Sequence, residues 1–227
     1  GNMVLNDSIR SVIMEGQYGF YNERTEYSFA TDSARLLEFS RGDTLYLHAD
    51  TLKSHLVLPD STRLLQAYHG VRFFRIDAQG VCDSMEFTSV DSLLHMYKLP
   101  IIWNENYQIT GDTIRIHMND STVDWALIPG SAFAAQHKDS VFYDQVSGKE
   151  LKAWFEQGQL RQIDVNGNAQ TIFYPQERDS TLTGLNKAES GFLRMYSDLR
   201  PVSPEDIFRK PEVKIEVVEE KKHRFNH

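Results

Sequence analysis

The chain has 227 residues, of which 41% are hydrophobic and 25% charged, a composition typical of a folded globular protein with a sizeable core. Its 24 lysine and arginine residues are outnumbered by 32 aspartate and glutamate residues, giving a formal net charge of −8. The basic residues are scattered along the sequence, with no basic stripe. This charge pattern argues against nucleic-acid binding through phosphate neutralisation.

The single cysteine, Cys82, excludes an intramolecular disulfide framework and a cysteine-rich zinc site. No histidine or lysine lies beside it in "GVCDSMEF", so we expect a small buried side chain and not a reactive thiol. The sequence contains no run of about 18 apolar residues, so it predicts no membrane-spanning helix. We interpret the leading Gly1 as the remnant of a processed expression tag, so a missing export signal does not argue against export.

Helical periodicity is confined to the start of the sequence. In "VLNDSIRSVIMEG", the side chains of Val4, Ile9, Val12 and Ile13 would line one face of a helix. The pattern predicts a short helix within an N-terminal segment of residues 1–17.

Beyond this segment, apolar and polar residues alternate with the period of two that β-strands require. Leu45 and Leu47 oppose Tyr46 and His48 in "DTLYLHAD". Further segments of this kind are residues 70–77, 112–118, 149–155, 160–165, 169–174 and 190–196. The clusters "DAQG", "NEN", "MNDST", "EQGQ" and "VNGN" suit tight hairpin turns. We therefore predict an all-β fold of short antiparallel strands.

Two kinds of repetition occur. "RGDTLYLHADTL" (41–52) comes back, in large part, as "TGDTIRIHMNDST" (110–122). Turn-like positions also recur at Gly70, Pro100, Gly130 and Gly167, a spacing of about 30 to 40 residues. Such a period is typical of stacked β units that bury a face on their neighbours. An ordinary β-sandwich or barrel with uneven hairpins is the alternative.

Residues suited to catalysis do not form a recognisable set. His48 and Asp50 are two apart on a predicted strand and could supply two metal ligands, which leaves a metal-dependent hydrolase as a minor hypothesis. There is no Gly-x-Ser-x-Gly elbow and no glycine-rich phosphate loop. The numerous Asp-Ser pairs are typical of turns and strand entries. These residues therefore favour no metal site and no nucleophilic catalysis.

Large apolar residues on the strand faces are more numerous than turns and edges require. They are Phe73, Met85, Phe87, Ile114, Ile116, Met118, Phe155, Ile163, Val165 and Phe173. A fully packed core is the simplest interpretation of each one. The functional alternative is an apolar trough between open, curved sheets, in which acyl chains replace part of the core.

Five stretches together resemble one family. They are "GDTLYLHADTL", "AYHGVRFFRIDAQGVCDSMEF", "LPIIWNENYQITGDTIRIHMNDSTVD", "DQVSGKELKAWF" and "VNGNAQTIFYP…GLNKAES". In order and composition they are similar to the OstA-like family, the periplasmic lipopolysaccharide-transport proteins of LptA type, in the form met in Bacteroidetes. The resemblance covers roughly residues 18–199 and places a proline-containing charged tail at 200–227.

The resemblance implies an open β-jellyroll whose interior accommodates lipid A acyl chains. It implies a non-enzymatic protein with no catalytic residues, no metal and no cofactor. It also implies end-to-end strand pairing with other OstA-like proteins, or head-to-tail with copies of this chain, in a bridge between the inner and outer membranes. The implied lipid-binding face adds Leu45 and Leu47 to the apolar residues named above. The protein would be periplasmic, free or membrane-associated. A structural or assembly module of the cell envelope, with a closed core and only protein partners, is the alternative function.

Overall fold

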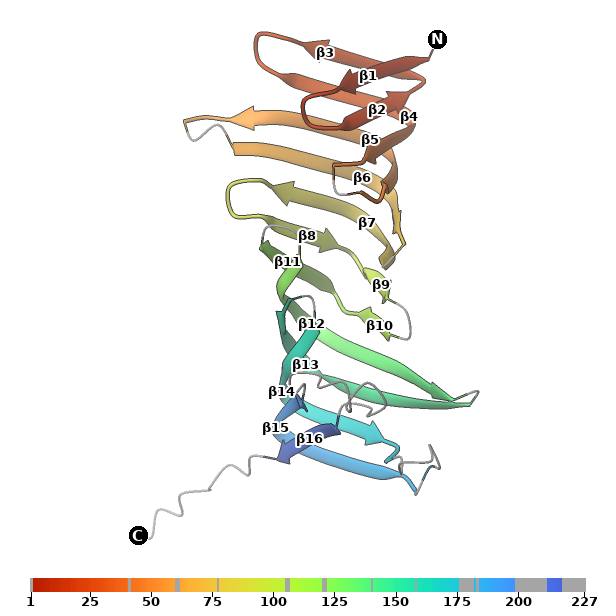
Figure 1. The fold of residues 1–227 in the computed structure, drawn as a ribbon, viewed down its shortest axis with the longest axis vertical. Helices are drawn as coiled ribbons and strands as arrows, with labels where there is room; N and C mark the ends of the chain where they lie inside the picture. Colours follow the sequence, from red (N-terminus) through yellow and green to blue (C-terminus); the bar gives the residue numbers. More distant parts are fainter. Residues whose placement is uncertain are drawn as a thin grey trace.

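The computed structural model describes residues 2–40, 42–59, 62–76, 78–104, 107–119, 122–139, 141–157, 159–175, 182, 184–198 and 212–217. Its strands form one 16-stranded sheet, and they stack in chain order along the long axis of the molecule (Figure 1). The described residues contain no helix, and the prediction of an all-β fold is confirmed. Strands that are neighbours in the sheet pair antiparallel, and the long strands of the stack pair with their neighbours in the sequence, as the turn clusters predicted.

The strands vary from four to eighteen residues in length. They are β1 (Met3–Asp7), β2 (Val12–Gly16), β3 (Tyr18–Asn22), β4 (Tyr27–Glu38), β5 (Leu45–Val57), β6 (Thr62–Arg75), β7 (Ala78–Thr88), β8 (Leu93–Tyr97), β9 (Ile101–Asn104), β10 (Tyr107–Thr110), β11 (Thr113–Asn119), β12 (Thr122–Asp139), β13 (Phe142–Glu156), β14 (Gln159–Phe173), β15 (Asn186–Asp198) and β16 (Glu212–Val217). Strand β16 lies in the segment predicted as a charged tail, whose other residues are outside the described ranges.

The predicted N-terminal helix is wrong, because this segment forms the β1–β2 hairpin. Asp7 accepts a hydrogen bond from the backbone N–H of Arg10 at 3.0 Å, and Ser11 adopts a positive φ of 55°. These local bonds close a turn where the helix would have continued. The hairpin also places Leu5 opposite Met14 and packs both against the core. Burial in the sheet therefore outweighs the helical periodicity.

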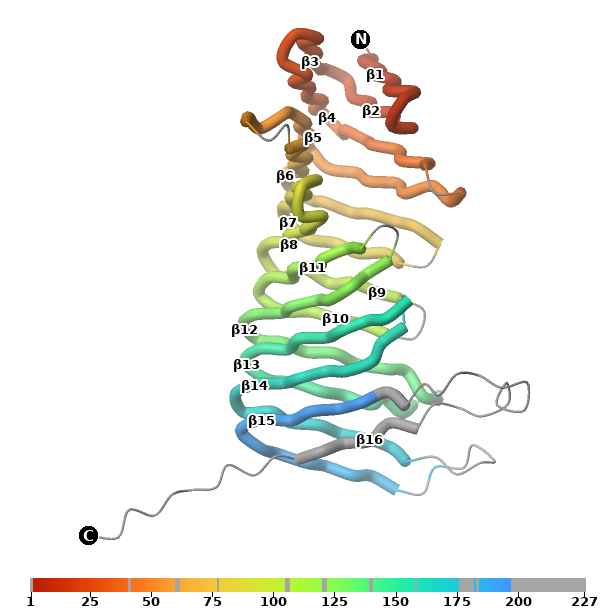
Figure 2. The backbone as a smooth tube through the Cα atoms, turned by 60° about the vertical axis from the view of Figure 1, so that its left-hand side comes forward, coloured from red at the N-terminus to blue at the C-terminus, as the bar shows by residue number. Residues whose placement is uncertain are grey.

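Most long strands bend sharply near their middle, and the bends divide the sheet into two layers. Register shifts mark the bends after Thr31, His48, Tyr68, Pro129, Ser147 and Asn166. One layer, called layer A, contains residues such as 45–48 and 71–75; layer B contains residues such as 51–57 and 62–68. Figure 2 shows both layers running from a common bent edge, which we call the corner, toward an open side, which we call the mouth.

The conformation at the corner depends on the direction of the strand. Strands that run from layer B to layer A turn through two consecutive residues of positive φ. These pairs are Asp32-Ser33, His69-Gly70, Lys98-Leu99, Gly130-Ser131 and Gly167-Asn168. Strands that run from A to B have no positive φ at the corner and carry a small residue there instead, namely Gly16, Ala49, Cys82, Gly111 and Gly148. Strands of opposite direction thus use different backbone conformations to make the same bend.

The small residues leave room for side chains of the other layer. A Cβ added at Gly148 would lie 2.4 Å from Cγ1 of Val165, and one at Gly111 would lie 2.3 Å from Cγ2 of Ile128. Both of these neighbours are fully buried. The inside of the corner is therefore too narrow for a larger side chain.

The prediction of short strands is wrong for the long strands of the stack. "VNGN" was expected to be a hairpin turn, but it is the corner of the 15-residue strand β14. "DAQG", "NEN", "MNDST" and "EQGQ" do join successive antiparallel strands, as predicted. Glycine and asparagine supply positive φ in both settings, so the local sequence does not distinguish a hairpin from a corner.

Three levels of the stack are broken at the corner into two separately labelled strands. In the centre of the stack, strands β9 and β8 pair with the two halves of β7, while β10 and β11 pair with the two halves of β12. The pairs β9–β10 and β8–β11 complete a closed circuit of six strands. This circuit joins layers A and B through the bent strands β7 and β12, so both layers are continuous through the centre.

The two Gly-Asp-Thr copies occupy different places. Asp43 lies at the mouth, where it accepts backbone hydrogen bonds from Thr44 at 2.8 Å and from Ile76 at 3.1 Å. Asp112 lies at the corner, where its backbone N–H donates to the carbonyl of Gly130 at 3.1 Å. The copies share a way of entering a strand, but they are not equivalent positions in a structural repeat.

Asp83 links neighbouring corners on the outside of the bend. Its carboxylate accepts hydrogen bonds from Ser84 Oγ at 2.6 Å and from Lys98 Nζ at 2.9 Å, and it faces His69 Nδ1 at 3.5 Å. These donors, Ser84 first and then Lys98, lower the pKa of Asp83 from 3.8 to about 2. The negative charge of Asp83 thus holds together the corners of three successive levels.

Substitution Gly148→Ala should destabilise the protein by about 1–3 kcal/mol, because the new methyl group would overlap Val165 in a filled interior. Urea unfolding followed by circular dichroism measures the change. Gly191→Ala, on strand β15, is the matched control, because no heavy atom lies within 4 Å of the position that its methyl group would take. Equal stability of the two variants would contradict a tightly packed corner.

The titration of Asp83 should shift when its donors are removed. We expect an NMR midpoint of about 2 in the native chain, an increase toward 3.8 in Ser84→Ala, and a smaller increase in Lys98→Met. Because the pKa is lower in the folded state, the contribution of Asp83 to stability is complete above the unfolded value and is lost as the pH falls through about 2. Lys187→Met, which removes a distant lysine, should leave the midpoint unchanged.

Candidate functional site

The interior between the layers is built from rows of side chains that follow the strand register. One row of layer B, here called the central row, contains Ala30, Leu52, Ala67, Met85, Met96, Ile114, Ile128, Leu151, Val165 and Leu193. All of its members are between 0% and 8% exposed. The part of the interior nearest the corner is therefore a dry, filled core.

Layer A supplies the opposing row, here called the facing row. It contains Met14, Leu36, Leu47, Phe73, Gly80, Ile102, Ile109, Ala134, Val146 and Thr171. At Gly80 a side chain is missing because the ring of Phe73 occupies the space: a Cβ there would lie 2.5 Å from the ring. The facing row is thus apolar almost from end to end.

A second row of layer B lies closer to the mouth and is here called the mouth row. It contains Leu65, Phe87, Leu94, Ile116, Ala126, Ala153, Ile163 and Met195. Its alanines are buried, but its larger side chains are only half-buried, although most of them pack against the core. An apolar band therefore runs along the open side of the stack, with part of its surface in contact with solvent.

The predicted lipid-binding residues fall into three groups. Leu47, Met85, Ile114 and Val165 are buried in the core; Phe73, Ile116, Phe155 and Ile163 are partly buried and pack against it; Leu45, Phe87, Met118 and Phe173 are half-buried. The structure thus places eight of them in one continuous apolar cluster. Binding of a lipid to them stays a prediction.

Several residues of this cluster were missed by the sequence reasoning. They include Leu52, Met96, Ile128, Val146, Leu151 and Leu193. Leu151 shares the parity of Phe155 in "KELKAWF", so the alternation could have identified it. Leu52 lies beyond the corner of β5, where the register shift changes the parity, and no sequence signal marks that change.

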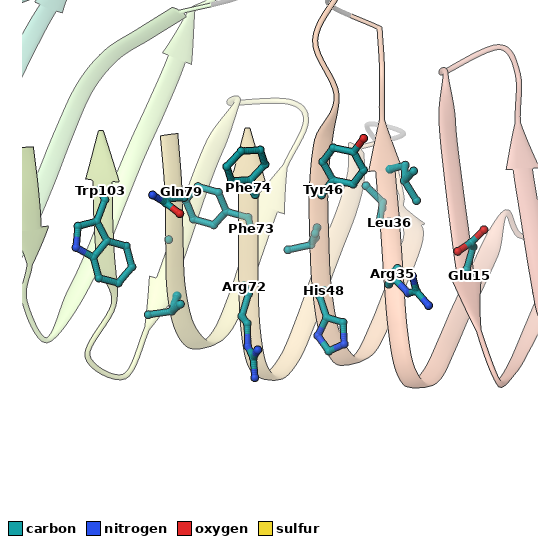
Figure 3. A pocket seen from close by; sticks show the side chains of 14 residues that line it. Glu15, Arg35, Leu36, Tyr46, His48, Arg72, Phe73, Phe74, Gln79 and Trp103 are labelled. Carbon is teal, nitrogen blue, oxygen red and sulfur yellow. The ribbon is translucent and has the colours of Figure 1, made fainter. Parts of the chain in front are cut away.

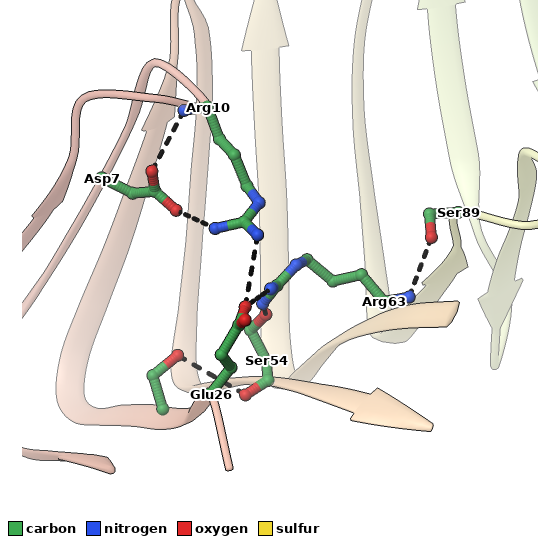
Figure 4. A network of polar contacts seen from close by, with 7 residues as sticks. Asp7, Arg10, Glu26, Ser54, Arg63 and Ser89 are labelled. Carbon is green, nitrogen blue, oxygen red and sulfur yellow. Dashed lines mark hydrogen bonds and ion pairs between the residues drawn. The ribbon is translucent and has the colours of Figure 1, made fainter. Parts of the chain in front are cut away.

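An ionic cluster connects the two layers across the mouth at the N-terminal end of the stack (Figure 4). Arg10, in the β1–β2 turn next to layer A, bonds to Asp7 at 2.6 Å and to Glu26 at 3.2 Å. Glu26 belongs to the β3–β4 turn of layer B and also pairs with Arg63. Arg63 in turn donates to Ser54 Oγ at 3.1 Å. We call Asp7, Arg10, Glu26 and Arg63 the clasp, because they join the edges that are otherwise apart.

The structure brings no metal-binding set together around the predicted pair. His48 points away from the interior of layer A, and Asp50 lies at the corner, where it accepts a hydrogen bond from Thr51. Among the described residues, no group of three or more His, Cys, Asp or Glu side chains could hold a metal ion. Cys82 is buried, and this burial raises the pKa of its thiol to about 12. Its thiol is therefore in the unreactive, protonated form near neutral pH.

In the described part of the chain, no helix is long and apolar enough to cross a membrane. No family model matches this chain, and a search of curated proteins gives no match either. The geometry of the interior and of the clasp is therefore the basis for a functional proposal.

Removing the central charge of the clasp should loosen the mouth. We expect Glu26→Gln to lower the free energy of unfolding by about 0.5–1 kcal/mol, since Glu26 serves two guanidinium groups but its side chain is 39% exposed. The difference should shrink in 1 M NaCl, where the screening length falls to about 3 Å.

The control for this experiment is Glu189→Gln, which removes a single exposed partner of Lys187. Chemical denaturation at low and high salt measures both variants. A loss for Glu26→Gln no larger than the loss for the control would show that the clasp does not hold the layers together.

Proposed function

We propose that this chain is a non-enzymatic glycolipid carrier of the lipopolysaccharide-transport type, which holds acyl chains along the apolar mouth row. In this proposal the protein works in the periplasm and has the open β-jellyroll of the OstA-like family. The interior supplies no chemistry; it supplies a surface on which acyl chains replace water.

The observation that carries the proposal is the half-buried mouth row. Leu65, Phe87, Leu94 and Ile116 are consecutive register partners on four strands, and each keeps part of its surface in solvent. Covering apolar surface stabilises a complex by about 25 cal/mol per Å². An acyl chain laid along this row would cover several such side chains at once, and its linear shape matches a row that crosses strand after strand.

The ends of the stack offer strand edges to which a protein partner can pair. Within the described residues, β1 pairs only with β2, and β3 pairs only with β4, so one edge of each strand keeps free backbone groups. At the other end, residues 186–190 of β15 form the last part of layer A. Such edges suit strand addition by a neighbouring molecule. We propose that end-to-end pairing with related β-folds, or with copies of this chain, extends the apolar band.

A specific observation favours the alternative function. The central row is fully buried, and the clasp spans the mouth at one end, as expected of an assembly module with a closed core. In that case the exposed surface of the mouth row would be covered by a protein partner. The two functions predict different results with lipid alone. A carrier binds lipid at Ile116 without a protein partner, and a closed module does not.

A photo-crosslinking amino acid in place of Ile116 should capture lipopolysaccharide added to the purified protein. The same amino acid in place of Arg115 is the matched control, because Arg115 is the preceding residue of β11 and its exposed side chain is on the outer face. Mass spectrometry of the irradiated protein measures the adduct. Capture of equal amounts at both positions would overturn the carrier function, and capture at neither would favour the closed module.

A further inference from the structure

A hollow of about 430 Å³ lies on the outer face of layer A, on the opposite side of the sheet from the apolar interior (Figure 3). Two parallel rows of outward side chains form its walls. Its floor is the backbone of Leu36, Leu47, Phe73 and Gly80, whose side chains belong to the facing row inside. The volume falls within the range of about 300–1,000 Å³ that small-ligand sites occupy.

The first wall is basic. Arg35, His48 and Arg72 are register partners on three neighbouring strands, β4, β5 and β6. Neighbouring strands lie about 4.8 Å apart, so the two arginine backbones are about 10 Å apart. Both arginine side chains are exposed, and within the described chain neither guanidinium has a carboxylate partner. Glu15 is the one acidic residue of the lining, at the edge beside Arg35.

This wall contrasts with the rest of the molecule. The whole chain carries a net charge of −8, yet this hollow gathers around a histidine two guanidinium groups that have no carboxylate partner among the described residues. The Nδ1 atom of His48 is buried and, among the residues described, has no hydrogen-bond partner. An unsatisfied buried polar atom is costly in a folded protein. Because this nitrogen is buried, a ligand in the hollow would contact it only after the imidazole ring turned.

The second wall is aromatic. Tyr46 and Phe74 are register partners and are 50% and 52% exposed, and Gln79 connects them to Trp103. The indole N–H of Trp103 donates to Gln108 at 3.1 Å, which fixes the position of its ring. Figure 3 shows Tyr46, Phe74 and Trp103 in a line parallel to the basic wall. The exposed rings of Tyr46 and Phe74 and the half-buried ring of Trp103 offer flat, electron-rich faces to the C–H groups of a ligand.

We infer that this hollow binds an anionic saccharide, with sugar rings against the aromatic wall and phosphate or carboxylate groups on Arg35 and Arg72. Guanidinium groups form paired hydrogen bonds with both kinds of anion. Both guanidinium groups lie on the same wall, so a single ligand with two anionic groups can contact both. The saccharide could belong to a glycolipid headgroup or to a soluble polysaccharide, since both present the same anions.

Isothermal titration calorimetry with two acyl-free probes tests the inference. One probe is a deacylated glucosamine disaccharide bisphosphate, and the other is trigalacturonate; binding of either supports the site, and the tighter probe identifies the source. Maltotriose is the neutral control. Absence of binding by both anionic probes, or equal binding of maltotriose, would overturn the inference, as would tighter binding of adenosine monophosphate.

Variants connect the binding to this hollow. The double variant Arg35→Ala/Arg72→Ala should weaken binding at least tenfold, and Arg35→Lys/Arg72→Lys should recover part of it through charge alone. Both arginines are exposed, so the fold should persist, which circular dichroism checks. Arg115→Ala, an exposed arginine on layer B, is the control and should leave affinity unchanged. An unchanged affinity in the double alanine variant would place the binding elsewhere.

The result of the saccharide-binding experiment is independent of the proposed acyl-chain carrier function. Neither probe contains an acyl chain, and the hollow and the mouth row belong to different layers and opposite faces. Failure of saccharide binding would leave crosslinking at Ile116 unaffected. Failure of crosslinking would leave the calorimetry unaffected.

Discussion

Every level of this stack has to bend in register with its neighbours, so that all the bends align at the corner. The rest of the structure depends on this constraint. Because the strands pair over both layers, a corner displaced by one residue would turn the side chains of a whole half-strand to the other face. The rows that cross the stack from Met14 to Thr171 and from Ala30 to Leu193 exist because no level makes that error. The corner is therefore what makes the interior continuous.

The backbone forms the corner in two ways, one for each strand direction. A strand that enters from layer B uses two residues of positive φ, whereas a strand that enters from layer A uses a small residue facing inward. Positive φ costs about 1 kcal/mol or more for residues with a Cβ. Yet Asp32-Ser33 and Lys98-Leu99 adopt it without glycine. Pairing on both sides of these corners supplies the energy that local preference opposes.

Because the corners depend on pairing between strands, the sequence predicts only part of the fold. The alternation of Leu45 and Leu47 identifies strand and face correctly, because burial on one side leaves a period of two in the sequence. Gly130 and Gly167 are visible as backbone signals, but whether the chain reverses there or only bends depends on distant partners. At Lys98-Leu99 the sequence signal is Pro100, which follows the pair and does not indicate that the two residues before it adopt positive φ. Local sequence thus reports the elements, and pairing across the stack decides how they join.

The two candidate sites differ in how far the sequence predicts them. Apolar interior positions could be predicted in part, since each one is marked by its own neighbours in the chain. The basic wall could not, because Arg35, His48 and Arg72 become neighbours only through register between β4, β5 and β6. His48 drew attention beside Asp50, as a metal ligand, but the structure gives it two arginines as lateral neighbours. Its chemistry is set by pairing and not by sequence proximity.

Strand β5 shows how both faces can serve one molecule. Leu47 points into the core, while its neighbours Tyr46 and His48 point into the outer hollow. Because Leu47 is 2% exposed and packed, it holds the backbone that forms the floor of the hollow. The packed interior therefore holds in place the backbone that carries the walls of the hollow. The mouth row lies in the other layer, beyond the corner, so the two surfaces share no side chain.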